Sequence, residues 1–415
     1  FDTESLLFFR NTPDAVQADQ GQVAIDIDYI VDPTYTSSLS KRLGGTGADK
    51  PNAIIADSNN NIIIAGYVTG NADFNADGSI SAGLPETTTA TYGSYDIFIS
   101  VFNSSGTYQW GKRLGGTGVD FVSGVATDSN NNIIVTGYTA SGNADFNADG
   151  SISAGLPETT TATYGSYDIF ISVFNSSGTY QWGKRLGGTG NDIGKSIATD
   201  LSNNIIIAGQ TAGNMDYNAD DSISAGLPET PNATFGSNDI FISVFNSSGT
   251  YQWGKRLGGT DSDDAPGVAT DSNNNVIVTG YVVALAGYSA DFDGDGSISA
   301  GLPETGAATY SGDYDVLISV FNSSGTYQWG QRLGNTSALF YSYGISITAD
   351  SNNRIISCGL SGGNIDLDGD GSISAGLPET TTGTYGGNDI FLAVFNPPDT
   401  TPPVPSSISP ASAST

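Results

Sequence analysis

The chain has 415 residues, of which 38% are hydrophobic, and a formal net charge of −30 at pH 7. With 43 acidic but only 13 basic side chains, its surface repels phosphates and anionic lipid, so nucleic acid and membranes are poor partners. Histidine is absent and Cys358 is the single cysteine, which excludes a Ser-His-Asp triad, a Cys-His pair, a zinc site and an intrachain disulfide.

The N-terminal segment, residues 1–40, contains two features that suggest strands. LLFFR (6–10) is a short apolar run. IDYIVDPTYTSSLSKRLGG (27–45) echoes the later sequence ISVFNSSGTYQWGKRLGG, with Leu39 where the other copies have a tryptophan. The segment is therefore expected to supply a strand, either to close a ring or to pair with another molecule.

Residues 41–397 consist of internal repeats, which are the main signal in the sequence. KRLGG begins at Lys41, Lys112, Lys184 and Lys255, and QRLGN begins at Gln331. The last copy stops early, at AVFNPPDT. We place the five repeats at residues 41–111, 112–183, 184–254, 255–330 and 331–397.

Each repeat is predicted to contain four short β-strands, exemplified by GVATDS (124–129), NIIVTGY (132–138), DIFISVFN (168–175) and TYQWGKRL (179–186). Asp, Asn, Ser and Gly lie where hairpin turns need them. In the third strand Ile169, Ile171 and Val173 alternate with Phe170 and Phe174, so both faces are apolar. A strand of this kind is typical of a sheet packed between two others. The fold class is therefore all-β, a β-propeller of five four-stranded repeats; a β-solenoid, whose repeats are typically shorter, is the competing fold.

The segments RLGGTG, ATDSNNNIIVTGYT and DIFISVFNSSGTYQW resemble the bacterial β-propeller repeat family known as SBBP. The resemblance covers nearly all of residues 41–397 apart from the inserted loops. It implies a propeller on exported or surface-associated bacterial and archaeal proteins, usually without a defined activity. The chain departs from the family pattern through long inserts between the second and third strands. It also has five repeats where the family name suggests seven, so the number of blades is open.

Ring closure has three interpretations. In the first, a strand around Thr34–Leu39 completes the final blade, which lacks its own fourth strand. In the second, LLFFR contributes to a sixth, irregular blade. In the third, LLFFR pairs with a neighbouring molecule, since a lone apolar strand can add to a sheet edge. After the repeats, residues 398–415 are rich in Pro, Ser and Thr and are typical of a linker or tail.

A calcium-like loop, DFNADGSISAGLPE (73–86), lies in the insert of the first repeat. Asp73, Asn75 and Asp77 alternate and are followed by a glycine, which is the start of an EF-hand or dockerin-type loop. Alternating side-chain oxygens can converge on one hard cation, and a later carboxylate completes the ligand set. Position twelve is Leu84, however, and the carboxylate of Glu86 comes two residues late.

The loop recurs in every repeat, which favours about one bound calcium ion per repeat over solvated turns without metal. Magnesium is less favoured because it retains more water. The third site is expected to be the weakest, because Asp221 replaces the turn glycine. The predicted ligands are Asp73, Asn75, Asp77, Ser79 and Glu86; Asp145, Asn147, Asp149, Ser151 and Glu158; Asp216, Asn218, Asp220, Ser222 and Glu229; Asp291, Asp293, Asp295, Ser297 and Glu304; and Asp366, Asp368, Asp370, Ser372 and Glu379.

No catalytic residue is predicted. A catalytic carboxylate pair needs two different environments, whereas nearly identical repeats give each carboxylate the same surroundings. The repeated aspartates Asp57, Asp128, Asp200, Asp271 and Asp350 are interpreted as turn residues, and the tryptophans as packing between blades.

The preferred function is a non-enzymatic, calcium-stabilised structural or adhesive protein, extracellular or on the cell surface, that self-associates into a surface layer or filament or binds a surface partner. The alternatives are a multivalent lectin-like module and, less favoured, a glycoside hydrolase. No apolar run reaches the length of a membrane-spanning helix, so direct membrane insertion is not expected.

Overall fold

The structure is a computed structural model, and it describes residues 39–396 except 141, 284–288, 308, 309, 311, 312, 336–340, 377 and 381–387. Contacts divide the chain into two units, Phe1–Lys41 and Arg42–Thr415, and every strand described here belongs to the second. The described residues contain strands but no helix, so none of them forms a helix that could cross a bilayer.

The strands are β1 (Gly44–Gly45), β2 (Lys50–Ala56), β3 (Ile62–Val68), β4 (Ala72–Asp73), β5 (Asp96–Phe102), β6 (Tyr108–Gly116), β7 (Asp120–Thr127), β8 (Ile133–Thr139), β9 (Ala144–Asp145), β10 (Asp168–Phe174), β11 (Tyr180–Leu186), β12 (Ile193–Thr199), β13 (Ile205–Thr211), β14 (Asp239–Phe245), β15 (Tyr251–Leu257), β16 (Asp264–Thr270), β17 (Val276–Val283), β18 (Tyr314–Phe321), β19 (Tyr327–Leu333), β20 (Tyr343–Ala349), β21 (Ile355–Gly362) and β22 (Asn388–Phe395).

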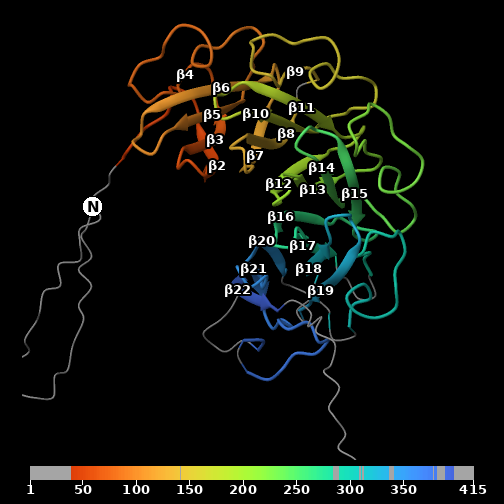
Figure 1. The fold of residues 1–415 in the computed structure, drawn as a ribbon. Coiled ribbons are helices and arrows are strands. Elements are labelled where there is room, and N and C mark those ends of the chain that lie inside the picture. Colours follow the sequence, from red (N-terminus) through yellow and green to blue (C-terminus); the bar gives the residue numbers. More distant parts are fainter. Residues whose placement is uncertain are drawn as a thin grey trace, which may run out of the picture. The chain divides into compact units, whose positions relative to one another are not determined.

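Four antiparallel sheets of four strands carry the first four repeats (Figure 1). Their orders are β2-β3-β5-β6, with β9 added beyond β6, then β7-β8-β10-β11, β12-β13-β14-β15 and β16-β17-β18-β19. The fifth sheet, β20-β21-β22, has three strands among the described residues. The all-β, four-stranded prediction is confirmed in this form. Ring closure and the number of blades stay predictions, and residues 1–38, with LLFFR and most of Thr34–Leu39, lie outside the described residues.

A bulge recurs where the first strand of each sheet pairs with the second. In the second sheet it lies between Val122 and Gly124. Gly137 on β8 lies opposite, and a Cβ added there would come within 1.9 Å of the carbonyl oxygen of Phe121. The bulged backbone approaches the neighbouring strand so closely that only glycine fits, which explains the glycine of the TGY and AGY sequences in the second strands.

The core lies between successive sheets. Ile169 and Ile171 of β10 belong to a buried cluster with Ile205 and Phe241 of the next sheet. Phe170, on the other face of β10, belongs to a cluster with residues of the preceding sheet. The third strand is therefore covered on both faces, as its sequence predicts. The first strands of successive sheets also contact one another, β2 with β7, β7 with β12, β12 with β16 and β16 with β20.

The tryptophans and the repeated aspartates have structural roles. Trp110 packs against Phe174 of the next sheet, with ring centroids 6.2 Å apart, and its Nε1 donates to the carbonyl oxygen of Ser176 at 2.9 Å. Asp128 accepts hydrogen bonds from the backbone N–H groups of Asn130 (2.9 Å) and Asn132 (2.8 Å), which closes the hairpin between β7 and β8. Both observations agree with the roles inferred from sequence.

Candidate metal centre

Each acidic loop begins at a junction between two sheets. In the second repeat β9 starts the loop, and its Asp145 pairs with Gly115, at the end of the fourth strand of the first sheet. The same pairing joins Gly44 to Asp73, Gly187 to Asp216 and Gly258 to Asp291. The first aspartate of these loops is therefore held by backbone pairing and is buried.

Backbone N–H groups wrap around this first aspartate. In the second repeat Asp145 accepts from Ala148 N at 2.6 Å through Oδ1 and from Gly150 N at 2.7 Å through Oδ2. Asn147 in turn accepts from Asp149 N at 2.8 Å. These bonds form a tight succession of Asx-turns, the backbone arrangement in which alternating side chains point towards one centre.

The late glutamate folds back onto the start of its loop. The buried Glu158 accepts from Asn147 N at 3.2 Å through Oε1 and from Ser153 N at 2.7 Å through Oε2. Its own carbonyl oxygen accepts from Ala144 N at 2.9 Å, beside the first aspartate. The two extra residues therefore do not carry the carboxylate away from the loop, and the role of Glu158 as a ligand stays a prediction.

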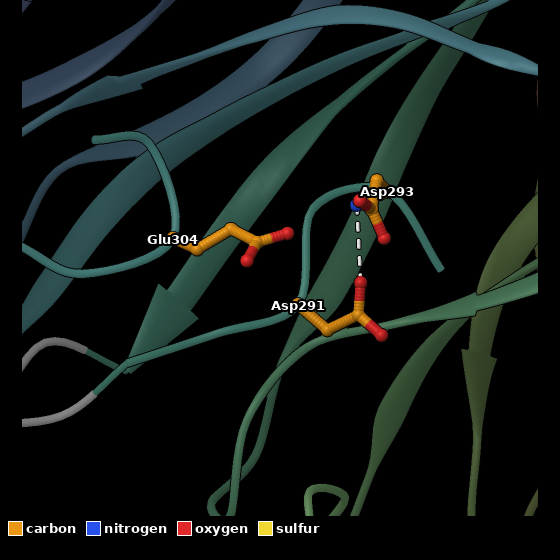
Figure 2. Close-up of side chains that lie close together, drawn as sticks. All are labelled: Asp291, Asp293 and Glu304. Atoms are coloured by element: carbon orange, nitrogen blue, oxygen red, sulfur yellow. Dashed lines mark hydrogen bonds between the residues drawn. The ribbon is translucent and has the colours of Figure 1, made fainter. Parts of the chain in front are cut away.

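The fourth and fifth loops bring three carboxylates together. Oxygen atoms of Asp291, Asp293 and Glu304 lie within 4.8 Å of one another, and Figure 2 shows the carboxylate of Glu304 pointing towards the loop that carries the two aspartates. Asp366, Asp368 and Glu379 form the equivalent group. An oxygen-only set of this kind suits a hard divalent cation.

The fifth-position aspartates and the serines that follow them bind each other. Asp295 is exposed, and its Oδ1 accepts from Ser297 N at 2.8 Å and from Ser297 Oγ at 2.6 Å. Asp77 and Ser79 are paired in the same way. The first aspartate and the glutamate are thus the inner residues of each loop, and the predicted ligands at the fifth and seventh positions lie at its outer side.

The turn at positions four and six of the loop needs left-handed backbone. Gly294 and Gly296 have φ values of +68° and +87° in the fourth loop. The third loop has Ala219 at +58° and Asp221 at +71°, so Asp221 adopts the glycine conformation. A non-glycine residue is disfavoured in this conformation, so the backbone at Asp221 is the reason to expect weaker cation binding at the third site.

Burial raises the pKa of the first aspartate in the second, third and fourth loops. It raises the pKa of Asp145 and of Asp216 to about 6, and that of Asp291 to about 7. For Asp291 the neighbouring carboxylates Asp293 and Glu304 raise the pKa further. The clustered negative charges are therefore costly in the protein alone, and a bound divalent cation would offset that cost.

Two residues that were not predicted as functional, Arg113 and Tyr92, hold the first and the second loop. The buried Arg113 pairs with Asp96 at 2.9 Å, and its guanidinium donates to the carbonyl oxygens of Pro85 (2.9 Å) and Gly70 (2.9 Å) at the two ends of the first loop. Tyr92 donates to Asp145 Oδ2 of the following loop at 2.7 Å. The signal in the sequence is the arginine of KRLGG and the aromatic residue that follows the loop, which is Tyr92 after the first loop and Phe235 after the third.

The chain matches known β-propeller repeats at two places. Residues 109–143 and 181–214 match the Beta-propeller repeat family SBBP. Each matched segment runs from the fourth strand of one sheet through the first two strands of the next, and the acidic loops lie outside both. The family resemblance is thus confirmed at these two places, and the calcium loops stay a prediction.

Further similarities are remote. The chain is 26% identical over 265 residues to an uncharacterized WD repeat-containing protein of Acanthamoeba polyphaga mimivirus. The alignment covers 60% of this chain and 18% of that protein. The chain therefore spans less than a fifth of that relative. Among solved structures, virginiamycin B lyase from Staphylococcus aureus is 12% identical (80% of this chain, 87% of that chain, TM-score 0.31). A gluconolactonase from Xanthomonas campestris is 10% identical (86% and 98%, TM-score 0.28).

Proposed function

We propose that this chain is an extracellular, non-enzymatic β-propeller protein with a structural or adhesive role, whose repeat loops are stapled by calcium. The observation that carries the proposal is the grouping of Asp291, Asp293 and Glu304, and of their fifth-repeat equivalents, within 4.8 Å. All the side-chain ligands offered there are oxygens, as calcium prefers. The long inserts would otherwise rest on few apolar contacts.

A staple, rather than a switch, fits the way the loops are held. Arg113 and the strand pairing fix both ends of the first loop, and there is no helix pair in the described residues for an ion to open. Successive loops also touch, because Thr91 Oγ1 donates to the Gly150 carbonyl oxygen at 2.8 Å and Asn232 Nδ2 to the Gly296 carbonyl oxygen at 2.7 Å. Ions in neighbouring loops would therefore reinforce one row of contacts.

The proposal is tested by titrating the full chain with calcium in a calorimeter, after removal of bound metal. The double variant Asp291→Asn and Glu304→Gln is expected to lose one binding site. Asp261→Asn, an acidic residue outside the loops, is the matched control and should keep the original stoichiometry. Equal stoichiometry in the parent and the double variant, or no calcium binding in any of them, would overturn the proposal.

A second candidate is multivalent carbohydrate binding, which rests on a cluster of tyrosines at the fourth and fifth sheets. Tyr314 lies 5.0 Å from Tyr341 and 4.9 Å from Tyr281, measured between ring centroids, and Tyr341 is exposed. Amphipathic aromatic rings of this kind are common at recognition surfaces. A glycan array probed in calcium tests this candidate: binding lost in Tyr341→Ala supports it, and an array without binding removes it.

The assembled form of the proposal, a surface layer or filament, depends on LLFFR (6–10), which lies outside the described residues. An apolar strand can add to the sheet edge of another copy. Electron microscopy of a chain that lacks residues 1–12 tests strand donation: assemblies should disappear, and unchanged assemblies would exclude it.

A further inference from the structure

The segment that follows an acidic loop contacts the loop of the next repeat. In the first repeat this segment leads from the loop towards β5. Thr91 Oγ1 donates to the carbonyl oxygen of Gly150 at 2.8 Å, and the Tyr92 hydroxyl donates to Asp145 Oδ2 at 2.7 Å. Asp145 and Gly150 are the first and sixth positions of the second loop. One repeat therefore contacts two of the positions that shape the loop of the following repeat.

The leucine at position twelve of each loop takes part in the same contact. The Leu84 side chain covers Gly150, because a Cβ added to that glycine would come within 2.7 Å of Leu84 Cδ1. Leu302 lies over Gly371 of the fifth loop in the same way, and the equivalent distance is 3.2 Å. The position that carries the closing carboxylate in an EF-hand is thus used here for packing between successive loops.

The tyrosine contact recurs at two further junctions between repeats. Tyr164 donates to Asp216 Oδ2 at 3.1 Å, and Tyr310 donates to Asp366 Oδ2 at 2.6 Å. These tyrosines and aspartates are buried. A hydrogen bond to a carboxylate is stronger than one between neutral groups. The first aspartate of the second, third and fifth loops is therefore held by a hydroxyl from the repeat before it.

The tyrosine binds the same aspartate oxygen as the backbone of position six. Asp145 Oδ2 also accepts from Gly150 N at 2.7 Å, and Asp366 Oδ2 also accepts from Gly371 N at 2.7 Å. Two donors on one oxygen fix the orientation of the carboxylate. The hydroxyl thus orients the aspartate without occupying Oδ1, which remains available to a cation.

The fourth loop lacks this hydroxyl. Phe235 is the residue at the tyrosine position, and it is buried beside Arg256, whose guanidinium carbon lies 5.9 Å from the ring centroid. In the part of the chain that the structure describes, Asp291 accepts from backbone N–H groups of its own loop and from no tyrosine. The contact to position six is kept, because Thr234 Oγ1 donates to the Gly296 carbonyl oxygen at 2.8 Å. The chain therefore contains its own comparison, a junction with one of the two contacts.

We propose that Tyr92, Tyr164 and Tyr310 are positioning residues for the cation site of the following repeat, so that two repeats complete each of these sites. The inference rests on the proposed function, and it deepens that function by naming the residues that couple neighbouring loops. A hydrogen bond that orients a metal ligand typically changes metal affinity by about tenfold or more. The loops then form a linked row, in which a loop that loses its shape loosens the loop after it.

Hydrogen exchange measured by mass spectrometry on the full chain in EDTA tests the tyrosine contact without relying on an ion. Tyr164→Phe should speed exchange in the third loop about tenfold, because the N–H groups of Ala219 and Asp221 bond to the aspartate that this hydroxyl holds. Phe235→Tyr should slow exchange in the fourth loop by a similar factor, since it adds the missing donor. The two loops differ in sequence, so their peptides can be distinguished.

Tyr138→Phe is the matched control. Tyr138 belongs to the same repeat as Tyr164 and is also partly buried, but its ring packs against Phe121 and Tyr167 rather than against a loop. The control variant should leave exchange in the third loop unchanged. A third loop that loosens equally in Tyr138→Phe and Tyr164→Phe would reflect a general loss of packing and would overturn the positioning role.

A calorimetric calcium titration of the same variants separates this inference from the function on which it rests. Tyr164→Phe should weaken the third site, the weakest step of the titration, by about tenfold. If calcium binds but Tyr164→Phe changes neither its affinity nor the exchange of the third loop, the inference is wrong and the proposed function stands. If neither the parent nor any variant binds calcium, the proposed function is wrong, and the role of the tyrosines in a cation site falls with it.

Discussion

At the scale of single residues, the five loops differ in ways that should rank their affinities. The fourth and fifth loops combine aspartate at the third position with glycine at both left-handed positions. The first and second have asparagine and a left-handed alanine, and the third has Asp221 in addition. More ligand charge and less backbone strain both favour binding, so the fourth and fifth sites should be the tightest and the third the weakest.

Replacing Asp221 by glycine is expected to strengthen calcium binding at the third site. The change removes a side chain from left-handed backbone, which is worth about 1 kcal/mol, or roughly fivefold in affinity. The measurement is the weakest step of a calorimetric calcium titration. The matched change Asp220→Gly removes a predicted ligand instead and should weaken the same step. Tighter binding after Asp220→Gly, or no change after Asp221→Gly, would contradict this ranking.

Buried aspartates outside the loops predict a pH dependence of stability. Burial raises the pKa of Asp192 and of Asp263 from 3.8 to about 7. The folded protein therefore binds protons at these two carboxylates more tightly than the unfolded chain does. Their contribution to the free energy of unfolding is fully present below about pH 4 and is lost as the pH rises through about 7.

Urea unfolding at saturating calcium is the measurement of this dependence. The free energy of unfolding should fall between pH 5 and pH 8. That of the Asp192→Asn variant should fall less steeply over the same interval. Asn at this position loses an acceptor for Gly188 N or Thr211 Oγ1, so its absolute stability will be lower, and only the slope is compared. A parent protein that gains stability across this interval would contradict the shift.

At the scale of elements, sequence periodicity predicted the strands because their pattern is local. The alternation of Ile169, Phe170 and Ile171 was enough to infer a strand covered on both faces. The anchors of the loops could not be inferred in this way. Arg113 contacts Pro85 and Tyr92 contacts Asp145 only because the sheets place distant parts of the chain together. Glu158 could be named as a candidate from the sequence, but the hydrogen bond that its carboxylate accepts from Asn147 N could not be inferred.

The arginine anchors give a prediction at the same scale. Arg256→Met should destabilise the fold by about 3–5 kcal/mol, because it leaves Asp239 buried without its counter-charge. Removing both charges, with Asp239→Leu in the same chain, should recover part of that loss. The measurement is the free energy of unfolding in urea. A loss as small as that of a surface pair, below about 1 kcal/mol, would show that the buried pair is not an anchor.

At the scale of the whole molecule, successive sheets are joined to one another in three ways. Apolar third strands pack between neighbouring sheets, tryptophans and tyrosines cross from one repeat to the next, and the acidic loops touch one another. In the proposed function, calcium would add to this frame rather than create it.

Thermal unfolding of the full chain in calcium and in EDTA tests the central claim most directly. At a free calcium concentration one hundred times the dissociation constant, each independent site adds about 2.7 kcal/mol to the free energy of unfolding. Several occupied loops should therefore raise the melting temperature by many degrees in calcium, and magnesium at the same concentration should do so less. Equal melting temperatures in calcium and in EDTA would contradict the claim that calcium staples the loops.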